Sequence, residues 1–165
     1  MSIKDLIQTM DQLNQVHESL LELSKLKTNV LIQNQVEQLN QIVNKENNLM
    51  KQITKLDHQR IDNISQFLLN KGYKPNAKIT VNDLTKLVFK AEEKQALKST
   101  QEKLLGTIEQ LKQLNQLNQK LIEQSLAYID YSMDLVLGPP EDEVVYHNPS
   151  LQQNIKRNGM FDRRA

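Results

Sequence analysis

The feature that most constrains this chain is an apolar repeat that runs through its first 70 residues. Apolar residues recur from Ile3 to Leu68, mostly at steps of three or four positions, and the first glycine is Gly72. This spacing places the apolar side chains on one face of a helix. A single helix over about residues 2–70 would be about 100 Å long. Because such a helix cannot be buried in a small globule, it must pair with another helix along its length.

Residues 70–80 mark a break in this pattern. Gly72 suits the C-terminal cap of a helix, and a proline follows shortly afterwards, as expected beyond a helix end. Thr80 and Asp83 have the spacing of a capping box, which predicts the start of another helix. We therefore expect a short helix over about residues 81–89, which would close the open end of the hairpin with its apolar residues Leu84, Leu87, Val88 and Phe89.

The expected architecture is all-α, with a long antiparallel helical hairpin of coiled-coil type in a domain of residues 1–137. The second long helix is expected over about residues 91–136, where the apolar repeat of three and four residues returns. From residue 138 the chain reads Gly-Pro-Pro and then holds few apolar residues. Because it cannot bury enough surface to offset its ordering entropy, residues 138–165 are expected to form a flexible tail.

The composition argues against several classes of partner. With 21 basic and 20 acidic residues the net charge is +1, so neither a nucleic-acid-binding face nor a polybasic membrane patch is expected. No window approaches 18 apolar residues, and the N-terminus lacks the apolar run of a signal peptide. The absence of cysteine is compatible with a reducing cytosol. The 19 Gln and 16 Asn lie between apolar residues at helical spacing, which favours a soluble helical pair over a prion-like segment.

No pattern in the chain indicates catalysis or a cofactor. The histidines His17, His58 and His147 lie far apart and form no HExxH pair, so a metal site would need remote ligands to converge. Glu92 and Glu93 are neighbours, and neighbouring side chains diverge on a helix. There is no glycine-rich phosphate loop. We expect no catalytic, cofactor-binding or metal site, and therefore no enzyme.

The end of the second long helix carries two adjacent apolar stripes. A two-helix hairpin can bury one of them, which consists of Leu121, Ser125, Tyr128, Ser132 and Leu135. Burying the other requires a third body, and it consists of Ile122, Leu126, Ile129, Met133 and Val136. That body could be the overhanging start of the first helix, a second copy of the chain, or the helix of another protein. Periodicity alone does not choose among them.

Three stretches of the chain, taken together, resemble the sequence of one known protein family. "LNQLNQKLIEQSLAYIDYSMDLV" (residues 114–136) resembles the distal-helix signature of the FlgN family of flagellar type III export chaperones. "VNKENNLMKQI" (residues 43–53) resembles the central segment of that family. The Gly-Pro break, the isolated tyrosine and the final "MFDRRA" resemble its C-terminus. The resemblance covers nearly the whole chain.

This resemblance implies a cytoplasmic chaperone that binds the hook–filament junction proteins FlgK and FlgL. It would prevent their premature self-association and deliver them to the export gate through the cytoplasmic domain of FlhA. Client binding by the family's distal helix and tail carries over to Leu121, Ile122, Leu126, Ile129, Met133 and Val136.

A tail tyrosine that docks on the gate in the family matches Tyr146, although His147 stands where the family often has glycine. The alternative interpretation of the chain is a structural coiled-coil oligomerisation module without a client. A homo-oligomer is compatible with both interpretations, and the sequence does not indicate a preference between the two clients.

Overall fold

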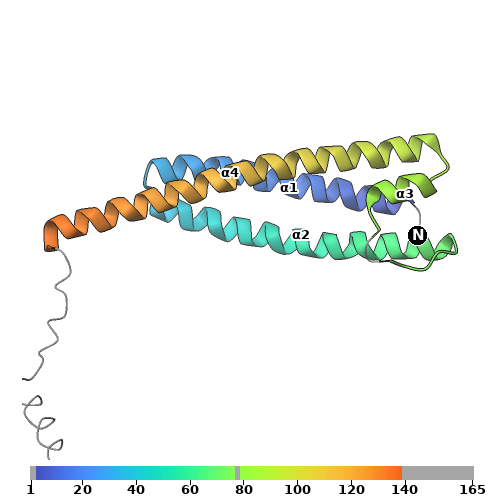
Figure 1. Ribbon diagram of the computed structural model, residues 1–165, viewed down its shortest axis with the longest axis horizontal. Coiled ribbons are helices and arrows are strands. Elements are labelled where there is room, and N and C mark those ends of the chain that lie inside the picture. Colours follow the sequence, from blue (N-terminus) through green and yellow to red (C-terminus); the bar gives the residue numbers. More distant parts are fainter. Residues whose placement is uncertain (1–2, 77–78, 139–165) are drawn as a thin grey trace, which may run out of the picture. The chain divides into compact units, whose positions relative to one another are not determined.

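The computed structural model describes residues 3–76 and 79–138, and every regular element among them is a helix. The four helices are α1 (Ile3–Ile32), α2 (Val36–Asn70), α3 (Val81–Leu87) and α4 (Ala91–Leu137), as Figure 1 shows. The predicted all-α class is therefore confirmed. The chain forms two compact units, Met1–Leu126 and Ala127–Ala165.

The single helix expected over about residues 2–70 is wrong, because the chain reverses between α1 and α2. Asn34 takes the left-handed conformation with a φ of 55°. The amide of Gln35 donates to the carbonyl of Val30 at 3.1 Å, and the amide of Asn34 donates to that of Leu31 at 3.3 Å. This pair of bonds is a Schellman motif, which satisfies the last carbonyls of α1. Asparagine tolerates the left-handed region better than most residues, so the chain turns here without glycine or proline.

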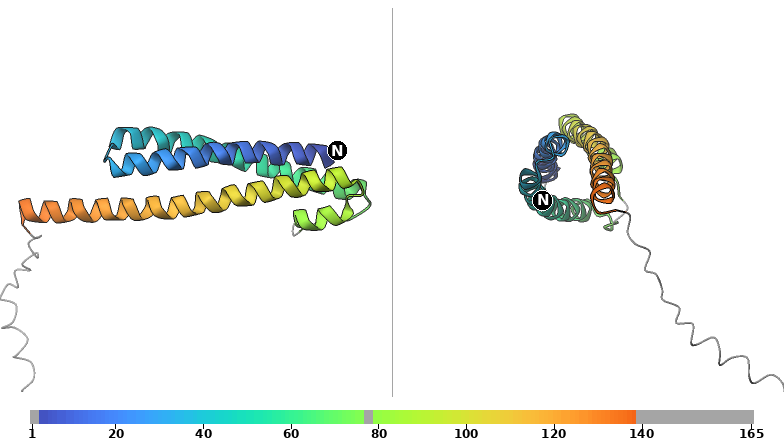
Figure 2. Two further views of the ribbon diagram at one scale, coloured as in Figure 1. Left: turned by 90° about the horizontal axis from the view of Figure 1, so that it is seen from above. Right: turned by 90° about the vertical axis from the view of Figure 1, so that its left-hand side faces the viewer.

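The antiparallel hairpin is formed by α1 and α2, which lie side by side in Figures 1 and 2. Near one end, the Nδ2 of Asn63 donates to the Oγ1 of Thr9 at 2.9 Å. Near the other end, the Nζ of Lys27 lies 2.9 Å from a carboxylate oxygen of Glu46. Antiparallel coiled-coil-like packing is thus confirmed, but its two partners come from the segment that was expected to be one helix.

Helix α4 runs parallel to α1 within the unit Met1–Leu126. The Nδ2 of Asn14 donates to the carbonyl of Thr100 at 3.1 Å, and further along both helices the Oγ of Ser24 donates to the Oδ1 of Asn115 at 3.1 Å. Residue numbers therefore rise together along the contact. This unit is a bundle of three long helices in which α2 is antiparallel to the other two.

The largest apolar core lies where α3 meets the start of α1, the end of α2 and the start of α4. Leu6, Leu68, Leu84 and Leu97, one from each helix, are fully buried there. The short helix α3 begins with the predicted capping box: the amide of Asp83 donates to the Oγ1 of Thr80 at 3.2 Å and the amide of Thr80 donates to an Asp83 carboxylate oxygen at 3.2 Å. The prediction that this helix closes one end of the bundle is confirmed.

Phe89 is an exception to that prediction, because its side chain is 89% exposed. Helix α3 ends at Leu87, and the extended backbone of Val88 turns the next residue away from the core. The Nζ of Lys71 lies 4.9 Å from the centre of the Phe89 ring, which gives the aromatic face a cation–π contact at the surface.

Glycines end both α2 and α4. Gly72, at a φ of 79°, forms a second Schellman motif in which the amide of Tyr73 donates to the carbonyl of Leu68 at 2.9 Å, so its predicted capping role is confirmed. Gly138, at a φ of 80°, donates to the carbonyl of Asp134 at 2.9 Å. The predicted flexible tail begins at this residue, and 139–165 lie outside the described residues. The division into a helical domain and a tail therefore stays a prediction.

None of the helices in the described ranges holds a stretch that is long and apolar enough to cross a bilayer.

Candidate functional site

The end of α4 exposes a dense set of large apolar side chains. Between Ala127 and Leu137 the large apolar residues that are more than half exposed are Tyr128, Ile129, Tyr131, Met133, Leu135, Val136 and Leu137. Single exposed apolar residues are common on protein surfaces, but a contiguous group of this kind marks an interaction surface. Asp130 and Asp134 lie among them on the same turns of the helix. This segment is the first candidate site.

The six residues predicted to bind a client fall into two groups. Leu121 and Ile122 are half-buried. Leu126, Ile129, Met133 and Val136 are exposed, the last of them by 83%. The geometry therefore leaves these four available to a partner.

The other apolar stripe of α4 is the one that a two-helix hairpin can bury against its partner. Leu121, Ser125 and Ser132 are half-buried, but Tyr128 and Leu135 are exposed. No helix of the chain covers the stripe at these two positions. The physical reason is that periodicity shows which residues share a face, whereas burial depends on where a neighbouring helix ends.

A cavity of about 310 Å³ lies among α1, α2 and α4 in the unit Met1–Leu126. Its apolar lining comes from Leu20, Met50 and Ile122, one residue from each helix. The ion pair between Lys27 and Glu46 also lines it, with side chains only 18% and 15% exposed. Ile122 is thus one of the six predicted client-binding residues and also lines this cavity.

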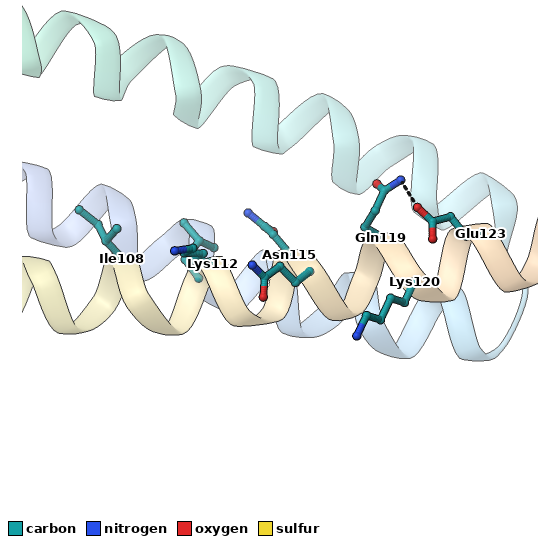
Figure 3. A pocket seen from close by; sticks show the side chains of 8 residues that line it. Ile108, Lys112, Asn115, Gln119, Lys120 and Glu123 are labelled. Carbon is teal, nitrogen blue, oxygen red and sulfur yellow. Dashed lines mark hydrogen bonds between the residues drawn. The ribbon is translucent and has the colours of Figure 1, made fainter.

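A wider open groove of about 680 Å³ follows α4 from Ile108 to Glu123 (Figure 3). Asn115 and Gln119 line both the groove and the cavity, so the two are contiguous. In Figure 3 Gln119 points toward α2, and its Nε2 donates to a Glu123 carboxylate oxygen at 3.1 Å. The groove combines the apolar Ile108 and Leu111 with three amides and with the charged side chains of Lys112, Lys120 and Glu123.

The chemistry-bearing side chains do not assemble into a reactive centre in the part of the chain that the structure describes. The Nδ1 of His17 lies 2.7 Å from the carbonyl of Leu13 on its own helix. Across residues 3–76 and 79–138, no group of three or more His, Cys, Asp or Glu side chains could hold a metal ion. Hydrogen bonds from Thr80 hold the pKa of Asp83 below its usual value, and they belong to the helix cap.

Sequence reasoning missed the contribution of α2 to the cavity. Met50 and Glu46 lie in the stretch that resembles the central segment of the FlgN family, and both line the cavity. The available signal was that stretch itself, where Leu49 and Met50 both fit the apolar repeat. Tyr146, which was predicted to dock on the gate, lies outside the described residues.

Comparison with known proteins identifies the relationship. The family model described as "FlgN protein" matches residues 1–154 of this chain. The chain belongs to the FlgN family. FlgN proteins are flagellar export chaperones and not a family of enzymes, so this chain is a helical chaperone of flagellum assembly.

A second FlgN-family protein is similar to this chain along its full length. It is the Bacillus subtilis (strain 168) protein named "Uncharacterized protein YvyG", which is 29% identical over 170 residues, covering all of both chains. No solved structure matches this chain.

Proposed function

We propose that this FlgN-family protein binds the hook–filament junction proteins FlgK and FlgL in the cytoplasm and keeps them from associating before export. The observation that carries this proposal is the exposed apolar end of α4, which a solvated helix end does not require. A client that presents an apolar helical stripe would self-associate through it. Covering that stripe with α4 removes the surface through which the client aggregates.

The proposed client-binding residues are the six on the second half of α4, namely Leu121, Ile122, Leu126, Ile129, Met133 and Val136. Most of them recur at steps of three or four residues and so share one face, which suits a helix that docks lengthwise. Met133 is unbranched and can adapt its shape to either of two clients.

The energetics fit a reversible complex. Burying one large apolar side chain contributes about 1.5–3 kcal/mol before costs are subtracted. Association and the ordering of side chains offset much of this gain. Four exposed side chains on α4 therefore support an affinity that holds the client in the cytoplasm and still allows its release for export.

Delivery is the second part of the proposal. We propose that the chaperone brings its client to the export gate by contacting the cytoplasmic domain of FlhA, and that Tyr146 takes part in this contact. Support for this part comes from the resemblance of the C-terminal segment to that of the family, since Tyr146 lies outside the described residues. An aromatic side chain that combines apolar area with a hydroxyl is well suited to a small docking contact.

The proposal is tested by purifying the full-length chain with FlgK and, separately, with FlgL, followed by size-exclusion chromatography with light scattering. A soluble complex of defined mass with at least one of the two is the expected result. A tight homo-oligomer that forms no complex with either protein would refute the proposal. That result would instead support the alternative of a coiled-coil oligomerisation module without a client.

A further inference from the structure

The contact between α1 and α4 within the unit Met1–Leu126 is held largely by polar side chains. Its hydrogen bonds join Asp11 and Asn14 to Thr100, Ser24 to Asn115, and Thr28 to Asn118. Between Leu111 and Leu126 the one buried residue of α4 is Asn118. In the second half of this contact, hydrogen bonds therefore replace most of the apolar packing.

The buried apolar residues are divided unequally along α4. Near α3, Leu97 is fully buried in the largest core, which all four helices share. The cluster further along α4 consists of Leu20, Leu21 and Leu111, which keep 6%, 8% and 9% of their surface exposed. Beside it, the cavity of about 310 Å³ lies among α1, α2 and α4. Because apolar burial is the main favourable contribution to folding, α4 is anchored firmly at its start and weakly further along.

We propose that the part of α4 from Gly106 to Leu126 separates from α1 and α2 as one segment, while α3 and the start of α4 stay packed. A hydrogen bond that is exchanged for bonds to water contributes little net free energy. The groups of Ser24, Thr28 and Asn118 all regain water partners in the open form. Opening this contact therefore costs far less than unfolding the core near α3.

Gly106 is the position at which this segment hinges. Glycine disfavours the interior of a helix because it loses more backbone freedom on folding than any other residue. Nothing packs within 4 Å of the place where a Cβ would stand at Gly106, so close packing does not require glycine there. Gly106 also lies between the apolar anchor at Leu97 and the first polar contact of the second half, at Asn115.

The opening changes which surface the bundle presents. Leu20 and Leu21 on α1 and Leu111 on α4 lose their cover, so the open form carries apolar area that the closed form hides. Closing again is specific, because the Ser24 hydroxyl and the Asn118 amide pair in one register. The segment is thus a conformational device within the unit Met1–Leu126, and it does not depend on which client the protein binds.

The chain has no cysteine, so a single introduced thiol reports on one position. Ser24→Cys places the thiol under α4 beyond Gly106, and Thr100→Cys is the control in the same contact before Gly106. Ser24 is 0% and Thr100 8% exposed, so burial alone predicts slower labelling at position 24. The proposed opening predicts the reverse: with excess aromatic disulfide reagent, the Ser24→Cys thiol of the full-length chain is expected to react about tenfold faster or more.

The labelling rate of each variant is compared with its own unfolding constant from urea denaturation, because replacing Ser24 removes hydrogen bonds by itself. The expected Ser24→Cys rate exceeds by about tenfold or more the rate that global unfolding allows, and it depends weakly on urea because little surface is exposed. Rates that match global unfolding in both variants would overturn the inference. So would a Thr100→Cys thiol that reacts as fast as the Ser24→Cys thiol.

Hydrogen exchange of the natural full-length chain, followed by mass spectrometry, tests the same opening without a substitution. An isolated helix of this length is marginal in water, so the separated segment loses its backbone hydrogen bonds readily. At low urea the amides of residues 107–126 are expected to exchange about tenfold faster or more than those of residues 94–105. Equal exchange in the two segments would show that α4 opens only with the whole bundle, and the inference would be overturned.

Discussion

Thr28 on α1 donates a hydrogen bond from its Oγ1 to the Oδ1 of Asn118 on α4, across 2.6 Å. The Nδ2 of the same asparagine donates to the carbonyl of Ser24 at 3.0 Å. Asn118 is almost completely buried, so α1 and α4 meet here through a satisfied amide in place of an apolar contact. A buried amide with defined partners fixes one register, because a slip of either helix would leave its polar atoms unpaired.

The first prediction concerns this amide. Asn118→Ala removes hydrogen bonds and leaves the partners on α1 buried without replacement, so the free energy of unfolding is expected to fall by about 1–3 kcal/mol. Urea denaturation followed by circular dichroism measures the change. Gln110→Ala, an exposed position on the same helix, is the control and is expected to change stability by less than about 0.5 kcal/mol. Equal losses in the two variants would contradict the role of Asn118.

The second prediction concerns the reversal between α1 and α2. Asn34→Val places a β-branched residue at a φ of 55° and is expected to lower the free energy of unfolding by about 1–2 kcal/mol. Asn34→Gly is expected to keep or raise stability, because glycine adopts this conformation without a steric cost. Thermal unfolding of both variants provides the comparison. If valine is tolerated as well as glycine, the chain does not turn through a left-handed residue here.

The third prediction concerns pH and the cap of α3. Hydrogen bonds from Thr80, followed by that from Lys86, hold the pKa of Asp83 below its usual 3.8. A lowered folded-state pKa contributes stability above the unfolded-state pKa, and that contribution is lost as the pH falls through the folded-state value. Asp83→Asn is therefore expected to be less stable than the natural chain at pH 7, with a difference that narrows as the pH falls below about 3.8.

Urea denaturation of both proteins over a series of pH values measures this narrowing. A difference in unfolding free energy that stays constant across the series would show that the charge of Asp83 contributes nothing to the cap.

The fourth prediction concerns the exposed stripe of α4. Ile129→Asp introduces a charge into the proposed client contact, where it would be desolvated without a partner, so binding of FlgK or FlgL is expected to weaken by at least about tenfold. Because Ile129 is 51% exposed, the helical content is expected to be unchanged. Isothermal titration calorimetry measures the affinity. Gln124→Asp, an exposed position facing away from this stripe, carries the same charge and should bind normally; unchanged affinity of Ile129→Asp would remove the stripe from the site.

The fifth prediction concerns delivery. Tyr146→Ala is expected to weaken the binding of the chaperone–client complex to the cytoplasmic domain of FlhA, with client affinity unchanged, because the two contacts use different residues. A pull-down of the ternary complex on immobilised FlhA domain measures the first quantity, and titration with client measures the second. Tyr73→Ala replaces an exposed tyrosine elsewhere on the chain and serves as control. Full retention of the Tyr146→Ala complex would exclude this residue from the gate contact.

Several structural features were readable from local sequence because their physics is local. The capping box needs only Thr80 and Asp83 three residues apart, and the end of α2 needs only a residue such as Gly72 that accepts a positive φ. The exposed stripe on α4 was likewise visible as an excess of apolar residues over what one helical neighbour can cover. Membership of the FlgN family followed from three ordered stretches that span the chain.

The sequence by itself therefore determined that the described part of this protein belongs to the all-α class, which residues share a face of each helix, and where two of its caps lie. Only the tertiary structure decided that the first 70 residues reverse at Asn34, that α4 runs parallel to α1, and that Met50 faces a cavity with Ile122. The reason is that a repeat of three and four residues is the same for one long helix as for two shorter ones. The choice depends on whether α1 can be buried against both α2 and α4, which is a property of contacts between residues far apart in the chain.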